Sequence, residues 1–260
     1  MRRNLSVLMV VLVVVSLMVW LGCTAVDGGT GTLKLSLTDA PAANFKSVVV
    51  DFDSIEVSQS TSGDKGWIVI NDDGGSIDLL TLTNGNLQEL GVKNLAAGKY
   101  NQIRIFVSSA TITLADNTVI DSSEINVASD TIKLVKPFTI EDGITTELIV
   151  DFDAGHSIVK NDSVSSQYKY IITPVTRIAS VKTTGALSGS VAAVEGKTVM
   201  VTAFQDGSSV AFAGTICDVS GDWMIGYLEP GTYDLLIESD DSSTDVQDQI
   251  VVAGEVTIVE

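Results

Sequence analysis

The chain has 260 residues, 45% of them hydrophobic and 18% charged, which is enough apolar material for one large or two ordinary domains and excludes a disordered chain. Its 15 Lys and Arg against 33 Asp and Glu give a net charge of -18, which argues against nucleic acid and anionic lipid surfaces as partners. The single His and two distant Cys exclude a dense zinc site and a disulfide scaffold, and 22 Gly with only 4 Pro favour short strands joined by turns.

The first 22 residues have the composition of an export signal. Arg2 and Arg3 precede an uncharged apolar run from Leu5 to Leu21, and a small residue follows the run. Basic residues stay on the cytoplasmic side while an apolar run of this kind enters the bilayer. We therefore predict an exported protein with a signal peptide at 1–22. An uncleaved membrane anchor is the alternative, because a run of about 17 residues is at the short end for a membrane-spanning helix.

Cys23 bears on how the exported chain is held. The stretch from Val19 to Cys23 resembles a bacterial lipobox, in which signal peptidase cuts before a Cys that then carries diacylglycerol, and Gly22 matches the small residue required there. Acyl chains anchor a protein durably, since each buried methylene contributes about 0.8 kcal/mol. We predict lipidation at Cys23, a flexible tether over residues 23–32, and a location on the extracytoplasmic side of a membrane, at the cell envelope or surface.

Residues 33–181 alternate apolar and polar side chains in short bursts. These bursts occupy residues 33–37, 48–52, 67–70, 100–107, 111–114, 131–135, 146–152 and 168–175. A period of two describes half-buried strands, and the clusters of Gly, Asn and Asp between them supply turns. One short helical piece is expected near Leu79 to Leu90. Strands and turns at this spacing predict a β-sandwich or a β-barrel.

Several segments of this region resemble the DUF4382 family of secreted bacterial and archaeal proteins. The resemblance is carried, in chain order, by LTDAP (37–41), VDFDSIEV (50–57), Trp67, IDLLTLTNG (77–85), LAAGKYNQIRI (95–105), DFDAGHSIV (151–159) and PVTRI (174–178). It implies export and frequent lipid attachment. It implies no activity, because none is established for the family.

The last part of the chain resembles the carboxypeptidase regulatory-like, transthyretin-type β-sandwich domain. The matching segments are GALSGSV (185–191), KTVMVTAF (197–204), CDVSGDWMIGYL (217–228), LEPGTY (228–233) and GEVTIV (254–259). The resemblance implies a spacer or ligand-presenting module, sometimes for polysaccharide, and not a peptidase. ASVKTT at 179–184 lacks apolar periodicity and marks the boundary. The predicted fold is all-β, with two antiparallel β-sandwich domains in tandem at 33–181 and 182–260.

The tetrapeptide Val-Asp-Phe-Asp occurs twice. On a strand, Asp51 and Asp53 point to one face, as do Asp151 and Asp153, with the Phe on the other face. Such carboxylate pairs are candidate Ca²⁺ ligands, or the acid and nucleophile of a glycosidase. The preferred interpretation is structural: a solvated strand face with Asp turns, and a β-bulge near residue 53, where the apolar set changes phase. No cofactor other than Ca²⁺ is indicated.

No side chain is predicted to be catalytic. His156, the single His, lies three residues after Asp153, but a Ser-His-Asp relay also needs an activated Ser, and the chain has no G-x-S-x-G elbow. His156 is therefore expected on a surface loop. Cys217 has no partner for an intrachain disulfide once Cys23 is lipidated, and it is expected to pack as a small residue.

A few aromatic and basic side chains bear on ligand binding. Trp67 and Trp223 each lie beside a turn at the start of a strand, where an exposed indole would stack on a sugar ring. Core burial is the preferred interpretation for both, because a sandwich core takes one large aromatic. Arg104 and Arg177, in an acidic protein, are expected to pair with carboxylates rather than to bind an anionic ligand.

These observations predict a non-enzymatic, lipid-anchored surface protein whose two β-sandwiches present a binding or adhesion face. The predicted partners are the membrane, through the N-terminal lipid, and a polysaccharide or another envelope protein. A structural module that depends on Ca²⁺ bound by the paired Asp residues is the first alternative. An extracellular glycan hydrolase that uses carboxylates is the second. The sequence does not name the ligand.

Overall fold

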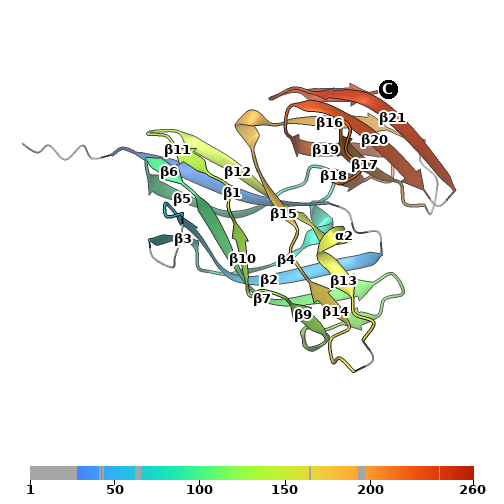
Figure 1. Ribbon diagram of the computed structural model, residues 1–260, viewed down its shortest axis with the longest axis horizontal. Helices are drawn as coiled ribbons and strands as arrows, with labels where there is room; N and C mark the ends of the chain where they lie inside the picture. The colour runs from blue at the N-terminus through green and yellow to red at the C-terminus, as the bar shows by residue number, and fades with distance from the viewer. Residues whose placement is uncertain are drawn as a thin grey trace, which may run out of the picture.

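The computed structural model describes residues 28–260 with the exceptions of 41, 43, 62–65, 164, 193–196 and 240. The predicted signal peptide, Cys23 and most of the predicted tether lie outside the described residues. Strands dominate the described part, and its helices are short turns (Figure 1). None of these helices is long and apolar enough to cross a membrane.

The first module is built on two large sheets. One has the order β15 (Thr176–Ser180), β12 (Thr145–Asp153), β1 (Thr30–Ala40), β5 (Gln88–Ala96). The other has the order β10 (Thr131–Leu134), β7 (Gln102–Leu114), β2 (Phe45–Ser58), β3 (Trp67–Asn71), with β4 (Gly75–Asp78) also paired to β2 and β8 (Val119–Ile120) to β7. Two smaller sheets join β11 (Phe138–Ile140) to β6 (Gly98–Tyr100), and β14 (Tyr170–Ile172) to β13 (Ile158–Lys160) and β9 (Ile125–Val127).

The second module also has two sheets. One has the order β19 (Asp222–Leu228), β16 (Gly185–Ser190), β22 (Val256–Val259). The other has the order β18 (Ala211–Ile216), β17 (Met200–Gln205), β20 (Gly231–Ser239), β21 (Ser242–Val251). The short helices are η2 (Leu79–Leu82), η3 (Ser122–Glu124), α2 (Ala154–Ser157) and η4 (Val181–Thr183), the last of which lies between the modules.

Each module has its own hydrophobic core, and the two cores share no residue. The first runs from Leu33 to Ile178 and contains the fully buried Tyr100. The second runs from Leu187 to Val259. In both, the buried positions are the apolar members of the alternating strands, because successive side chains of a strand point to opposite faces.

Strand β2 shows why its apolar residues change phase. Val48 and Phe52 are buried in its first half, and Ile55 and Val57 in its second. The register of β2 against β7 shifts on either side of Phe52. An extra residue at such a shift turns the following side chains to the other face. The predicted β-bulge near residue 53 is therefore confirmed.

The all-β prediction is confirmed, and most strand pairs are antiparallel. Three pairs are parallel, namely β1 with β12, β9 with β14, and β16 with β22. The turn signals of the sequence specify hairpins between successive strands, whereas parallel partners lie far apart in the chain, so the pattern did not predict them. The expected helix near residue 79 ends at Leu82, and β5 follows it.

The predicted tether over residues 23–32 is too long. Thr30, Gly31 and Thr32 begin strand β1 and pair with the end of β5. Gly31 is required there, because a Cβ atom would lie 2.1 Å from the carbonyl oxygen of Glu141. The absence of a side chain at Gly31 thus permits close packing of neighbouring backbones.

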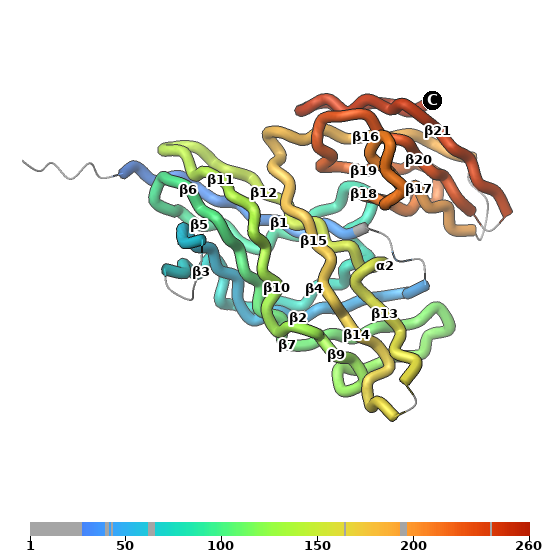
Figure 2. Tube along the Cα trace, viewed as in Figure 1, coloured from blue at the N-terminus to red at the C-terminus, as the bar shows by residue number. Residues whose placement is uncertain are grey.

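The second module packs against one side of the first. In Figure 2 the orange and red strands of the second module lie beside β15 and α2 of the first module. Strand β18 contacts β1, and β19 contacts β15. We call the boundary between the two modules the seam.

Candidate functional site

The first Val-Asp-Phe-Asp segment lies on β2, with Phe52 pointing into the core. Asp51 accepts a hydrogen bond from the Ser109 hydroxyl, and hydrogen bonds from Ser109 and Ser76 lower the pKa of Asp51 below its usual value. Asp53 is exposed to solvent. This pair is therefore a largely solvated strand face with a hydroxyl partner on each neighbouring strand.

The second segment lies on β12, and its first carboxylate is buried. Asp151 is only 6% exposed, and its Oδ2 lies 2.6 Å from Nη2 of Arg177 on the adjacent strand β15. Burial raises the pKa of Asp151, and the positive charge of Arg177 acts against that rise. The remaining polar atoms of the pair, Asp151 Oδ1 and Arg177 Nε, are buried without a hydrogen-bond partner.

Asp153 begins the short helix α2 and holds the single His. Its Oδ1 accepts from the backbone N–H of His156 at 2.9 Å, and its Oδ2 lies 2.7 Å from His156 Nδ1. The opposite side of the helix start is fixed by Asp39 of β1, whose Oδ1 accepts from the Ala154 N–H at 3.0 Å. His156 is exposed, as predicted, but on a helical turn.

The two carboxylate pairs are not brought together. Asp51 and Asp53 belong to the sheet of β2, and Asp151 and Asp153 to the sheet of β12. Among the described residues, no group of three or more His, Cys, Asp and Glu side chains is placed to hold a metal ion. Binding of Ca²⁺ stays a prediction that no contact in the described structure supports.

The two Trp side chains occupy different environments. Trp223 is 3% exposed in the core of the second module, and this burial removes it from the candidate stacking residues. Trp67 is half-buried on the outer face of its sheet, with the Arg104 guanidinium 4.0 Å from its ring centroid. Arg104 in turn pairs with Glu56 at 2.5 Å, which confirms the predicted carboxylate partner.

Cys217 is half-buried and packs against the second core, as predicted. Burial raises the pKa of its thiol, and the neighbouring charge of Asp218 adds to the rise. A thiol with a raised pKa is a poor nucleophile at neutral pH. Cys217 is therefore a packing residue.

The turn at residues 83–86 pins the modules together. Asn84 has a φ of 61° and reaches into the second module, where its N–H donates to Thr215 Oγ1 at 2.9 Å and its Oδ1 accepts from the Met224 N–H at 2.6 Å. The sequence predicted a turn here, which the positive φ agrees with. It gave no indication of the partners, because they are more than 100 residues away along the chain.

Arg177 forms a second link across the seam. Its Nη1 donates to the carbonyl oxygen of Tyr227 at 2.7 Å, and its guanidinium lies 5.0 Å from the centroid of the Phe212 ring. Tyr227 has a φ of 58°, which turns its carbonyl group toward the first module. Arg177 thus joins the buried Asp151 of one module to the backbone and an aromatic ring of the other.

Four adjoining hollows follow the seam and together form what we call the seam groove. They measure about 390, 290, 220 and 250 Å³ in order from η4 to α2. Each includes residues of both modules. Adjacent hollows share lining residues, which are Lys136, Ile178 and Glu229, then Thr176, Arg177 and Phe212, then Asp153 and Ala211.

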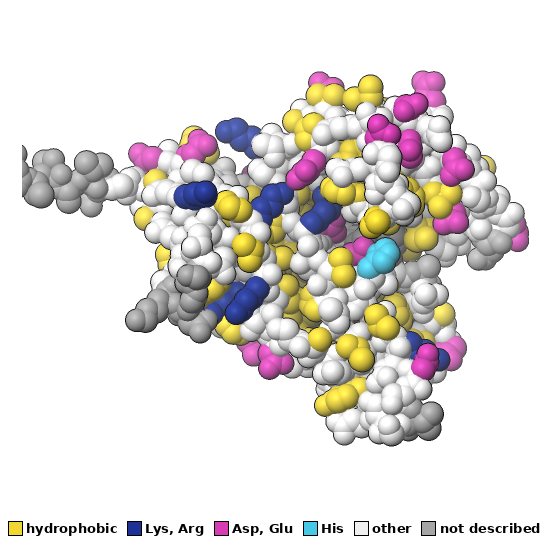
Figure 3. All heavy atoms as spheres, in the orientation of Figure 1, with side chains coloured by type: hydrophobic (Ala, Val, Ile, Leu, Met, Phe, Trp, Pro, Cys, Tyr) yellow, Lys and Arg dark blue, Asp and Glu magenta, His cyan; other side chains and the backbone are white. Residues whose placement is uncertain are grey.

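Charge is unevenly distributed on the two sides of the groove. Residues 185–260 contain thirteen Asp and Glu but a single basic residue, Lys197. The groove wall from the first module carries both signs of charge, with Lys133, Lys136 and Arg177 on one hand and Glu141, Glu147 and Asp153 on the other. In Figure 3 the Lys and Arg side chains lie on the first module, whereas Asp and Glu side chains appear on both modules.

The fold and this groove define a two-module, all-β protein with a hollowed boundary. A family model for a domain of unknown function, DUF4382, matches residues 30–174. The chain therefore belongs to the DUF4382 family. No curated protein matches it in sequence.

Solved structures with some similarity include the TIE protein and two pilins of bacteria. The TIE protein of Bacillus anthracis aligns with 13% identity and a TM-score of 0.23 over 89% of this chain, which spans only 34% of that protein. GBS52, the minor pilin of Streptococcus agalactiae, aligns with 12% identity and a TM-score of 0.22, over 87% of this chain and 93% of the pilin. BcpA, the major pilin of Bacillus cereus, aligns with 8% identity and a TM-score of 0.23, over 88% and 69%. TM-scores of this size do not establish a shared fold.

Proposed function

We propose that the protein is a non-enzymatic, lipid-anchored cell-envelope or surface protein that holds an extended ligand in the seam groove. The ligand is a polysaccharide strand or an extended segment of another envelope protein. The observation that carries this proposal is the continuity of the groove, whose four hollows share residues along the whole seam.

The groove has the composition of a binding cleft. Ligand clefts are lined mainly by apolar side chains, with a few polar groups that orient the ligand. Here Val175 and Phe212 supply apolar surface, and Thr176, Arg177 and Asp153 supply polar groups. The contacts of Arg177 across the seam hold the two walls of the groove in place. Because the walls are already ordered before the ligand binds, little of the binding free energy is lost in ordering them.

Lipidation at Cys23 would place this groove close to a membrane surface. Strand β1 begins at Thr30, seven residues after Cys23. An extended chain spans at most about 3.6 Å per residue, so the first strand would lie within about 25 Å of the lipid. Labelled palmitate should enter the wild type and not a Cys23→Ser variant. Export without labelling would indicate an uncleaved anchor helix.

The second module would act as a ligand-presenting module of the carboxypeptidase regulatory-like type. Its LEPGTY segment forms a compact corner, in which the fully buried Tyr233 donates its hydroxyl hydrogen to the Glu229 carbonyl at 2.9 Å. This contact fixes the start of β20. The same segment places Glu229 in the groove, 3.1 Å from Lys136 of the first module.

Blocking the groove tests the proposal. Ala211 lines two of the hollows, so Ala211→Trp should abolish binding to a panel of neutral and acidic polysaccharides and of envelope-protein extracts, measured by affinity electrophoresis and pull-down. Val210 is the matched control, because it is 73% exposed and does not line the groove. Val210→Trp should bind as the wild type does. Equal binding by both variants would refute the groove as the binding site.

A further inference from the structure

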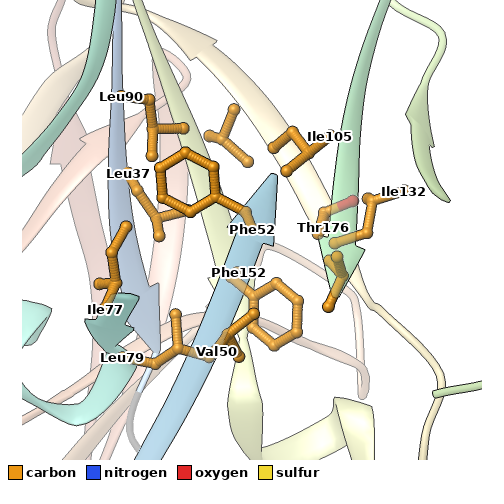
Figure 4. A pocket seen from close by; sticks show the side chains of 12 residues that line it. Leu37, Val50, Phe52, Ile77, Leu79, Leu90, Ile105, Ile132, Phe152 and Thr176 are labelled. Carbon is orange, nitrogen blue, oxygen red and sulfur yellow. The ribbon is translucent and has the colours of Figure 1, made fainter. Parts of the chain in front are cut away.

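The core of the first module contains an apolar cavity of about 30 Å³ (Figure 4). Its twelve lining side chains are Leu37, Val50, Phe52, Ile77, Leu79, Leu90, Ile105, Val107, Ile132, Val150, Phe152 and Thr176. The Thr176 hydroxyl is the one oxygen atom among them. A cavity of this size has room for a water molecule but offers it too few polar partners, and apolar cavities of this kind stay dry and accept apolar molecules.

The repeated Val-Asp-Phe-Asp segments build this cavity from both sides. Val50 and Phe52 reach it from β2, and Val150 and Phe152 from β12, in the opposite sheet. The two Phe rings face the same space in Figure 4. The Val and Phe side chains of both repeats therefore line the cavity, on the opposite face of the strand from the carboxylates.

The cavity lies beside two edge strands, β10 and β15, which contact each other. Ile132 belongs to β10 and Thr176 to β15, and these strands end their respective sheets without pairing with each other. Thr176 also lines the seam groove beside Arg177. The Thr176 side chain therefore borders both the cavity and the groove.

The groove outside these two strands is both apolar and cationic. Val135 is 74% exposed there. Lys133 and Lys136 line the same hollow, with Glu229 as the single carboxylate. Lys136 Nζ is shared between Glu229, at 3.1 Å, and the Ile178 carbonyl, at 2.7 Å, whereas Lys133 has no ion pair with any described residue. Two lysines beside the exposed Val135 give this hollow a local positive charge, although the chain as a whole is strongly negative.

We propose that this cavity accepts the tail of a single-chain fatty acid, inserted between β10 and β15, with its carboxylate at Lys133 and Lys136. The apolar lining suits a methylene chain, and the lysines suit an anionic head group. A cavity of about 30 Å³ has room for the end of one chain and not for the paired chains of a phospholipid. The small volume admits only the end of the tail, and the exposed Val135 covers the part that remains in the groove.

The test uses octanoate and the chain from Thr24 onward, which contains both cores and every strand of the described residues. Octanoate should raise the Tm and shift the methyl NMR signals of Leu37, Ile105 and Ile132, which line the cavity. Octanol, which lacks the charge, should bind about two- to fivefold more weakly, as should a Lys133→Ala, Lys136→Ala double variant. Lys93→Ala, on the exposed face of β5, is the matched control and should bind as the wild type does.

Filling the cavity gives the complementary test. Val107→Phe should abolish binding of octanoate, and Ile132→Phe serves if the first variant does not fold. Val92→Phe, at an exposed position of β5, is the control for the added ring. Shifts of surface methyl groups alone, or binding that survives a folded cavity-filling variant, would refute the cavity. Equal affinity for octanoate and octanol would refute the role of the lysines.

Discussion

Replacing Arg177 with Met tests whether a buried ion pair holds the seam. The substitution keeps an unbranched stem and removes the contacts to Asp151, to the Tyr227 carbonyl and to the Phe212 ring. Removing one partner of a buried ion pair costs about 3 to 5 kcal/mol, because the other charge stays buried. The Arg177 side chain is 22% exposed, so water reaches the site in part. We therefore expect the low end of this range, about 3 kcal/mol of unfolding free energy near neutral pH.

The pH dependence separates this mechanism from a loss of packing. Burial already raises the pKa of Asp151, and the loss of Arg177 would raise it further. A carboxyl group whose folded pKa lies above its unfolded value stabilises the fold below the unfolded pKa, and this contribution is lost as the pH rises through the folded pKa. The deficit of Arg177→Met should therefore be largest near neutral pH and shrink as the pH falls toward about 4.

Urea unfolding, followed by Trp fluorescence near pH 7 and near pH 4.5, measures both effects. Lys182→Met is the matched control, because Lys182 Nζ lies 4.0 Å from Glu141 Oε1 at an exposed position, where an ion pair contributes less than about 0.5 kcal/mol. A deficit for Arg177→Met below about 1 kcal/mol would refute the reasoning, since no buried charge would then have been stranded. So would a deficit of equal size at both pH values.

Three further predictions concern the contacts of Asn84 across the seam, the buried tyrosines and the carboxylates. Asn84→Gly keeps the positive φ but leaves the Met224 N–H without an acceptor, so the free energy of unfolding should fall by about 1 to 2 kcal/mol. An unchanged urea midpoint would show that this contact does not hold the modules together. Tyr100→Phe and Tyr233→Phe should each cost about 1 kcal/mol, because each hydroxyl donates to a backbone carbonyl, at 3.2 and 2.9 Å; thermal unfolding of the two variants measures this. Ca²⁺ and Mg²⁺ at matched ionic strength should shift the Tm equally. A shift of several degrees with Ca²⁺ alone, lost in either Asp51→Asn or Asp151→Asn, would instead establish a Ca²⁺ site.

Local patterns predicted several strands with alternating burial, among them β2, β7 and β12. They missed β21, because almost all of its side chains are exposed and no alternation arises. They also missed β5, where Leu90 and Leu95 are the only fully buried apolar side chains. An edge strand that faces solvent on both sides has the composition of a loop, so its identity depends on the backbone hydrogen bonds of its partner.

The seam could not be predicted from the sequence, because its contacts join distant residues. Arg177 was expected to pair with a carboxylate, and that much is confirmed. Asp151 is its partner because the two residues lie opposite each other in the register of β12 and β15. That register became known only with the structure. The contact from Arg177 to Tyr227 requires in addition a positive φ at a residue that is not glycine.

The two modules share a corner that the sequence shows only in part. LEPGTY at 228–233 was recognised, and LAAGKY at 95–100 has the same Leu, Gly and Tyr spacing. In both segments the Leu is buried, and the Tyr hydroxyl donates to the carbonyl four residues earlier. A buried Tyr needs a partner for its hydroxyl, and this corner supplies one from the local backbone. The shared spacing of Leu, Gly and Tyr is therefore enough to place the Tyr hydroxyl next to its carbonyl acceptor in both modules.

The repeated Val-Asp-Phe-Asp segments show how the same tetrapeptide acquires two roles. In both segments the Val and Phe side chains point inward, and together they line one cavity. The outward carboxylates differ because their strand neighbours differ. Asp51 lies opposite Ser109 and Ser76, which stabilise its charge while water remains close. Asp151 lies opposite Arg177 beneath the second module, so its charge is buried and depends on a single cation. What covers the outer face of the strand, and not the tetrapeptide itself, decides whether its Asp is a solvated side chain or part of the seam.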